Sequence, residues 1–233
     1  MITKMNSSRW AKWLIIPGLP LIILSMMALT NPNSISSKEA ILAANTQQSA
    51  APDGWILSGS NPENYKTGLD NQISQHGQKC GFIESTVTDP SGFTTLMQQC
   101  SVNNFKGKRI KMTGFIKTKD VDQGGMMWIR IDDFDKKIMA DFDNMEDRPI
   151  TGNSDWTKCE IIFDVPDVKC LLSFGFMLAG SGKIWFDNLT FEIVNASVDK
   201  TAYLLNKAIP DEMLSRVPEV IPEKAPANLD FEE

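Results

Sequence analysis

The chain has 233 residues, a net charge of −6 and a single histidine. Residues 1–44 contribute +3, which leaves −9 for the rest, and no basic stripe is present. We therefore expect no nucleic-acid partner, because an acidic surface repels phosphate backbones. His76, without a second histidine or a CxxC pair, gives no basis for a zinc site or a serine–histidine–aspartate triad.

The first 30 residues resemble a segment that is handed to the secretion machinery. Lys4, Arg9 and Lys12 precede an uncharged apolar run over 13–29 that contains two prolines. This pattern predicts either a cleaved signal peptide or an uncleaved hydrophobic helix that anchors the chain in the membrane. Both alternatives predict an extracytoplasmic protein, secreted or periplasmic in the first case and membrane-tethered in the second. The polar residues 31–53 are expected to be a flexible linker.

Residues 54–194 carry the pattern of an all-β domain. Short runs of alternating apolar residues are separated by Gly, Pro, Asn and Asp, and no long helical period is present. We predict about eight strands, at 79–86, 93–102, 109–118, 126–132, 138–142, 157–165, 169–178 and 183–194. This arrangement predicts an antiparallel β-sandwich or jelly roll. Residues 195–227 are expected to form one or two short helices within 201–217 and a proline-rich arm.

The stretch 126–132 alternates strictly between two kinds of residue. Met127, Ile129 and Ile131 fall on one face of the predicted strand. The opposite face carries Trp128, Arg130 and Asp132, because side chains alternate along a strand.

An indole, a guanidinium and a carboxylate in a row are suited to a sugar. Aromatic faces stack on sugar rings, and fixed polar groups satisfy the hydroxyls. We predict a ligand site formed by Trp128, Arg130 and Asp132, joined by Phe115 and Lys117 from a strand nearby in sequence. The alternative is that the charged pair makes contacts within the sheet and that Trp128 covers a second layer of core.

Other conspicuous side chains are expected to be structural. Trp156 and Trp185 are predicted to lie in the core. Asp147 and Arg148 are expected to form an ion pair that fastens their loop.

The four cysteines allow two interpretations. Cys80 and Cys100 are symmetric about the turn at Pro90, and Cys159 and Cys170 about the turn near Pro166. In an exported chain this symmetry predicts the disulfides Cys80–Cys100 and Cys159–Cys170, provided that the strands are neighbours. The alternative is four small buried thiols, since jelly rolls often send consecutive strands to opposite sheets.

Several motifs together resemble a known module. They are Gly107-Lys108-Arg109-Ile110, Trp128-Ile129-Arg130, the loop 143–150 (DNMEDRPI), Gly152, Asp155-Trp156 and the run 183–188 (KIWFDN). The chain from about Gly54 to Val194 resembles the jelly-roll module found beside bacterial AraC-type regulators and erythromycin-esterase-like proteins. That module belongs to the galactose-binding-like sandwiches, whose relatives include carbohydrate-binding modules.

The sequence differs from that module at the position of the first strand. Such modules open with an Asn-Leu-x-Phe-Glu strand, which is missing before Gly54, whereas the motif stands at 228–232 (NLDFE). We expect either a circularly permuted sandwich, in which residues 228–233 return to fill the first-strand slot, or the remnant of a second copy. The resemblance further implies a structural calcium where first and last strands meet, held here by Asp187 and Glu232. No cofactor is expected to be required.

These observations predict a non-catalytic extracytoplasmic binding module for a carbohydrate or similar polar ligand. The alternative is a membrane-tethered interaction, structural or sensory domain that holds a protein partner and no small molecule. Carboxylate pairs such as Asp141 with Asp143 or Asp132 with Asp133 could in principle support glycoside chemistry. Acidic residues at strand ends are ordinarily solvated groups, so we expect no enzyme.

Overall fold

The computed structural model describes residues 51–209 and 225–233, and β-strands are the main secondary structure of this part. The strands are β1 Ile56–Gly59, β2 Tyr65–Asp70, β3 Cys80–Ser85, β4 Phe93–Ser101, β5 Arg109–Asp133, β6 Ile138–Asp143, β7 Ile150–Asp164, β8 Cys170–Ala179, β9 Lys183–Val194 and β10 Tyr203–Ala208. Two single 3₁₀ turns, Pro62–Asn64 and Asn103–Phe105, complete the elements. Within the described ranges there is no helix long and apolar enough to span a bilayer. The predicted N-terminal segment lies outside them.

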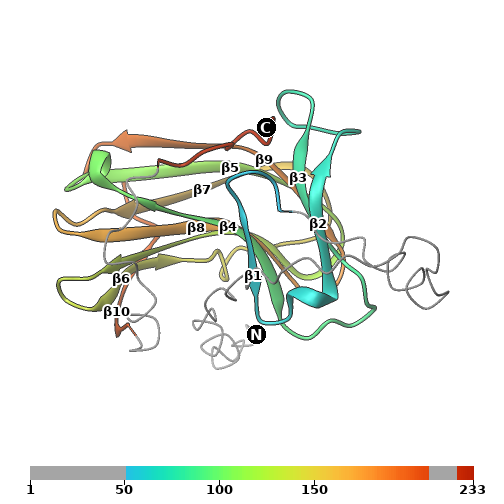
Figure 1. Cartoon of the computed structure of the whole chain (residues 1–233), viewed down its shortest axis with the longest axis horizontal. Helices are drawn as coiled ribbons and strands as arrows, with labels where there is room; N and C mark the ends of the chain where they lie inside the picture. Colours follow the sequence, from blue (N-terminus) through green and yellow to red (C-terminus); the bar gives the residue numbers. More distant parts are fainter. Residues whose placement is uncertain (1–50, 210–224) are drawn as a thin grey trace, which may run out of the picture.

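All strand pairs are antiparallel, and the long strand β5 belongs to two layers (Figure 1). Its second half, from Gly124, pairs with β8 and β6, which gives a first layer in the order β1-β4-β8-β5-β6-β10. Its first half, up to Lys119, pairs with β9 and β7, which gives a second layer in the order β2-β3-β9-β5-β7. The predicted antiparallel sandwich is confirmed.

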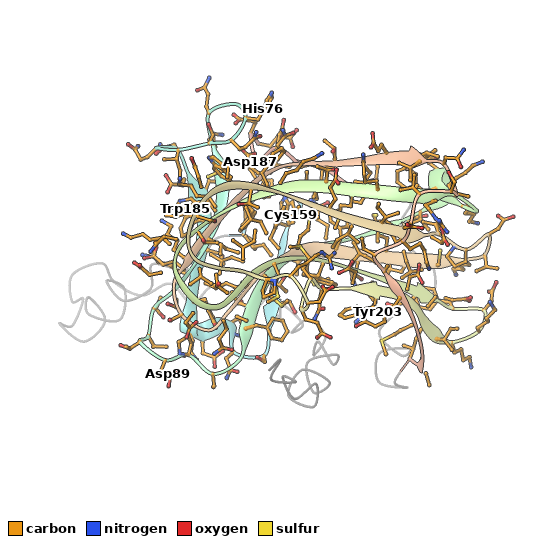
Figure 2. The ribbon with its side chains drawn as sticks, turned by 180° about the vertical axis from the view of Figure 1, so that it is seen from behind. His76, Asp89, Cys159, Trp185, Asp187 and Tyr203 are labelled. Carbon is orange, nitrogen blue, oxygen red and sulfur yellow. The ribbon has the colours of Figure 1, made fainter. Side chains whose placement is uncertain are left out.

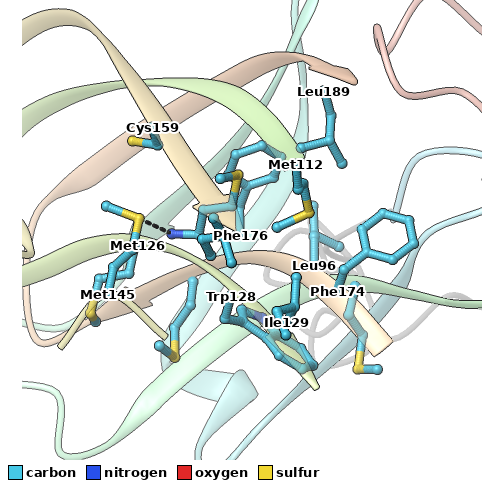
Figure 3. Packing of buried hydrophobic residues seen from close by; sticks show 14 of the residues in the cluster. Leu96, Met112, Met126, Trp128, Ile129, Met145, Cys159, Phe174, Phe176 and Leu189 are labelled. Atoms are coloured by element: carbon cyan, nitrogen blue, oxygen red, sulfur yellow. Dashed lines mark hydrogen bonds between the residues drawn. The ribbon is translucent and has the colours of Figure 1, made fainter. Parts of the chain in front are cut away.

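The core lies between these layers and combines aliphatic side chains, methionines and aromatic rings (Figure 3). Phe176 of β8 stacks on Phe186 of β9 with ring centroids 4.5 Å apart, and Phe174 meets Phe191 edge-on at 5.0 Å. These two contacts join opposite layers. Burial of such large apolar surfaces is the main favourable contribution to folding.

Three sequence predictions about strands need correction. The predicted strands 109–118 and 126–132 are one strand, because the chain between them passes through register shifts and a left-handed Asp120 (φ 53°) without turning back. β7 starts at Ile150 rather than at 157, because its polar first half pairs with that bulged part of β5. The helix expected within 201–217 is wrong for residues 203–208, which form β10 against β6. The rest of that segment, 210–217, lies outside the described residues.

The C-terminal residues return to the sandwich, as predicted. Phe231 is fully buried and stacks on Trp55 at 4.8 Å. Trp55 Nε1 donates to the carbonyl of Asn228 at 2.9 Å, and the backbone N–H of Leu189 in β9 donates to Leu229 at 3.0 Å. Figure 1 shows the C-terminus beside β9 and β3. The segment is not a strand, however, because Asn228 and Phe231 adopt left-handed backbone angles.

The four cysteines are free and buried, so the predicted disulfides are wrong and the alternative of buried thiols is confirmed. Cys80 lies in β3 of the second layer and Cys100 in β4 of the first. Cys159 lies in β7 and Cys170 in β8, which again belong to different layers. The prediction of disulfides from symmetry about a turn fails because the two strands that flank each turn belong to different sheets. Burial raises the pKa of each thiol to about 12.

Candidate functional site

The sandwich divides the five predicted ligand residues between its two outer surfaces. Trp128, Arg130 and Asp132 lie in the half of β5 that belongs to the first layer, on the face opposite to Met127, Ile129 and Ile131. Trp128 belongs to the buried core cluster, as the alternative interpretation expected, and Figure 3 shows it among the packed side chains. Phe115 and Lys117 lie in the other half of β5, on the outer face of the second layer. The two groups therefore cannot contact one compact ligand, and the predicted site is wrong as a single unit.

The predicted alternation along 126–132 is confirmed. Met127, Ile129 and Ile131 are opposite Phe176, Phe174 and Leu172 of β8, which line the core. Trp128, Arg130 and Asp132 face outward opposite Gly175, Ser173 and Leu171. We call this outer surface the Trp128 face, formed by Thr95, Gln99, Trp128, Arg130, Asp132 and Ser173.

Trp128 is held at both its ring and its polar edge. Its Nε1 donates to Thr95 Oγ1 at 2.8 Å, and that hydroxyl donates to the carbonyl of Phe176 at 2.7 Å. Gly175 stands directly opposite Trp128, and a Cβ there would lie 2.2 Å from the carbonyl oxygen of Leu96. Strands β4 and β8 therefore approach too closely for any side chain beside the indole. Trp128 is only 3% exposed.

Arg130 and Asp132 form a buried ion pair within one strand. Arg130 Nε and Nη2 both donate to Asp132 Oδ2, at 3.1 and 2.9 Å. The other carboxylate oxygen, Oδ1, is buried and has no hydrogen-bond partner among the described residues. Arg130 is 3% exposed and Asp132 2%. Burial raises the pKa of Asp132, and the Arg130 guanidinium opposes that rise.

A row of side chains crosses this face at the level of Arg130. Gln99, Ser173, Arg130, Phe142 and Tyr203 are successive register partners on β4, β8, β5, β6 and β10. Gln99 Nε2 donates to Ser173 Oγ at 3.1 Å, and the ring of Phe142 meets Tyr203 edge-on at 5.8 Å. The two end residues are exposed, whereas Ser173 and Arg130 are buried. Sequence reasoning missed Thr95, Gln99 and Ser173, because only strand register identifies them.

The outer face of the second layer carries a different, half-buried set of side chains, which we call the Trp185 face. It consists of Asp70, Phe82, Phe115, Lys117, Lys183 and Trp185. Lys117 lies opposite Trp185 and binds Asp155 with a separation of 2.7 Å. Trp185 and Trp156 were predicted to be core residues, and both are only half-buried. Figure 2 shows Trp185 far from Tyr203 of the first layer.

Asp187 and Glu232 lie against the same loop but do not form a calcium site. Asp187 Oδ2 accepts the backbone N–H groups of Gln75 and His76, at 2.8 and 2.9 Å. Glu232 Oε1 accepts those of Gln78 and Lys79, at 2.7 and 2.9 Å. Calcium requires converging oxygens, whereas N–H donors already surround these carboxylates. Among the described residues no group of three acidic, histidine or cysteine side chains could hold a metal.

These contacts have opposite effects on the two carboxyl groups. Burial raises the pKa of Asp187 despite its N–H donors, and the charge of Glu232 adds to the rise. The N–H groups of Lys79 and Gln78 lower the pKa of Glu232. Glu232 therefore fastens the C-terminus to the loop over 74–79, which is a structural role.

The carboxylate pairs considered for catalysis are separated or neutralised. Asp132 points outward from β5, whereas the next residue, Asp133, points the other way, opposite Cys170. Asp141 is 2.9 Å from Lys200 Nζ, and Asp143 is 2.7 Å from Arg148 Nη2.

Arg148 also binds Asp147 at 2.7 Å. The predicted ion pair that fastens this loop is therefore confirmed.

Comparison with known proteins gives one relative in sequence. No family model matches the chain. The uncharacterized HTH-type transcriptional regulator YbfP of Bacillus subtilis (strain 168) is 38% identical over 181 residues, which cover 77% of this chain and 57% of the regulator. The chain thus spans somewhat more than half the length of the curated relative it matches.

The similar solved structures share low sequence identity with this chain. A carbohydrate-binding module in complex with β-1,4-galactotriose is 13% identical, with a TM-score of 0.42 over 61% of this chain and 90% of that one. A promiscuous carbohydrate-binding module of the β-sandwich superfamily is 12% identical, with a TM-score of 0.44 over 63% of this chain and 59% of that one. A cyclase from Fischerella sp. TAU is 14% identical, with a TM-score of 0.46 over 64% and 89%.

Proposed function

We propose that this chain is a non-catalytic binding module that recognises a hydroxyl-rich ligand, in the first place a carbohydrate, on the Trp128 face. The observation that carries the proposal is Asp132 Oδ1, a buried carboxylate oxygen beside the Arg130 guanidinium for which the described residues supply no donor. A buried acceptor of this kind is costly unless a donor reaches it. A ligand hydroxyl is such a donor.

The neighbouring groups fit the same chemistry. Within the described part of the chain Arg130 binds Asp132 through Nε and Nη2, which leaves Nη1 to donate to a ligand oxygen. One hydroxyl can therefore donate to Asp132 and accept from Arg130. The indole of Trp128 supplies the flat apolar surface that packs on the C–H side of a sugar ring.

The burial of this face affects how a ligand would bind. Trp128, Arg130 and Asp132 are almost inaccessible to solvent. Binding therefore includes a step that exposes these side chains. We expect association below the usual range of about 10⁵–10⁷ M⁻¹s⁻¹ for that reason.

Two features support a non-catalytic role. The carboxylates at 132, 133, 141 and 143 are each held by a cation, and Asp132 and Asp133 point to opposite faces. A glycosidase needs two carboxyl groups that face one bond. A binding module needs only fixed donors and acceptors.

We also propose that the protein is located outside the cytoplasm. The basic and apolar N-terminal segment supports an extracytoplasmic module, secreted or tethered to the membrane.

The second candidate is a sensory or protein-binding domain. The similarity of this chain to part of a transcriptional regulator favours that candidate. A sensory domain could use the same ligand site, whereas a protein-binding domain would not require it.

A glycan array tests the proposal. We would compare the full chain with Asp132→Asn, which turns the free acceptor oxygen into an amide donor at constant size, and with Asp89→Asn, an exposed turn residue (Figure 2). A charge-assisted hydrogen bond is worth about 1.5–3 kcal/mol, so Asp132→Asn should bind about 10- to 100-fold more weakly. Asp89→Asn should bind like wild type. If a folded wild-type chain binds no glycan, the carbohydrate proposal is rejected.

A further inference from the structure

The Trp185 face carries a second aromatic surface that the proposed site does not use. Phe82 of β3 and Trp185 of β9 are direct register partners, so their rings lie side by side on the outer surface of the second layer. Gly68 of β2 stands opposite Phe82, and Lys117 of β5 stands opposite Trp185. One row across four strands therefore contains two rings, with a glycine at one end and an ammonium group at the other.

A carboxylate at the indole edge and an ammonium group over both ring faces fix the rings in place. Trp185 Nε1 donates to Asp70 Oδ2 at 2.8 Å. Lys183 Nζ lies 4.6 Å from the ring centroid of Phe82 and 4.5 Å from that of Trp185. The same ammonium group is 3.6 Å from Asp70 and 3.4 Å from Glu84. A surface held in one geometry loses less entropy when it binds a ligand.

This surface is open, in contrast to the Trp128 face. Phe82, Trp185 and the neighbouring Phe115 are half-buried, and the Lys117 side chain is 30% exposed. In Figure 2 Trp185 lies at the edge of the molecule. A ligand that displaces the Lys183 ammonium from the rings can therefore reach them without a change in the strands.

The charges indicate what kind of ligand fits. Lys183 is paired with Asp70 and Glu84, and Lys117 with Asp155. Because positive and negative groups are matched, the surface offers directed donors and acceptors without a strong field of one sign. Such a surface favours an uncharged, polyhydroxylated ligand over a nucleic acid or an acidic polymer.

We propose that the Trp185 face is a second binding surface, independent of the Trp128 face, which takes a neutral glycan across the rings of Phe82 and Trp185. The apolar side of a sugar ring packs on the aromatic floor, while Asp70, Glu84, Lys117 and Lys183 bind its hydroxyls. Because the core separates the two faces, they engage different glycan chains. One molecule can thus bridge two chains, and a polymeric glycan is retained more strongly than a short one.

The test uses the full chain and neutral hexasaccharides of glucose, galactose and xylose, titrated by calorimetry. Trp185→Ala and Phe82→Ala are compared with Asp132→Asn and with the exposed control Asp89→Asn. Each chain is first checked by circular dichroism and urea unfolding. Trp185→Phe serves as a milder variant, since it keeps an apolar ring in place but loses the bond to Asp70.

The proposal is supported if Trp185→Ala and Phe82→Ala each lose at least about tenfold in affinity, or bind one glycan fewer per chain. Trp185→Phe should show a smaller loss. Those losses must also appear in the background of Asp132→Asn, which weakens binding at the other face and so separates the two surfaces. The inference is overturned if Trp185→Ala and Trp185→Phe, both folded, bind with unchanged affinity and stoichiometry. Absence of any binding by wild type overturns it as well.

Discussion

Removal of the Phe231 ring should destabilise the sandwich strongly, although this residue is third from the C-terminus. The ring is fully buried and stacks on Trp55 at 4.8 Å. It also meets Phe186 at 5.2 Å and Phe176 at 6.4 Å, so it joins both layers of the core. Substitution of a buried Phe by Ala typically costs about 3–5 kcal/mol, through lost burial and the cavity that remains.

The assay is urea unfolding of Phe231→Ala, followed by tryptophan fluorescence and circular dichroism. With an m-value of about 2 kcal/mol/M, a loss of that size lowers the urea midpoint by about 1.5–2.5 M. Asp230→Ala is the matched control, since Asp230 is exposed and its substitution should cost less than about 0.5 kcal/mol. A midpoint for Phe231→Ala within about 0.5 M of wild type would refute the placement of the C-terminal segment in the core.

Three further predictions concern the thiols, a close strand contact and pH. All four cysteines should react with Ellman's reagent only after denaturation, because burial raises their pKa to about 12; fast reaction of the native chain would contradict this. Gly175→Ala should cost more than about 2 kcal/mol in urea unfolding, because its Cβ would lie 2.2 Å from the Leu96 carbonyl, and an unchanged urea midpoint would contradict this close approach. The Arg109 hydrogen bond lowers the pKa of Asp164 below its ordinary value of 3.8, against the opposing effect of burial, so its contribution to stability is present above that pH and is lost as the pH falls through the lowered value. Asp164→Asn should therefore lose less stability than wild type between neutral and acidic pH in urea titrations, and an identical loss would show that this pair does not contribute.

The sequence predicts the fold well where apolar alternation is strong and local. β9 has the predicted bounds, and β3, β4, β6 and β8 differ from prediction by one or two residues at their ends. Prediction fails where tertiary pairing overrides local pattern. β10 forms only because β6 presents an open edge, and β5 continues through residues 119–124 because bulges replace the turn.

The candidate site could be predicted only in part for the same reason. Alternation correctly places Trp128, Arg130 and Asp132 on one face. It does not reveal that Phe115 and Lys117, eleven or more residues earlier on the same strand, face outward from the other layer. Partners such as Thr95 and Ser173 come from register between strands that are distant in sequence, which a single sequence does not contain.

The indole N–H resonances of the full chain provide the most direct test of the central claim. A glycan found by the array is titrated into labelled protein, and Trp128→Phe assigns the Trp128 signal. The account predicts that the Trp128 resonance shifts and saturates with the ligand, because its Nε1 bonds to Thr95 within the proposed site. Saturable binding that leaves the Trp128 resonance unmoved would contradict ligand recognition on this face.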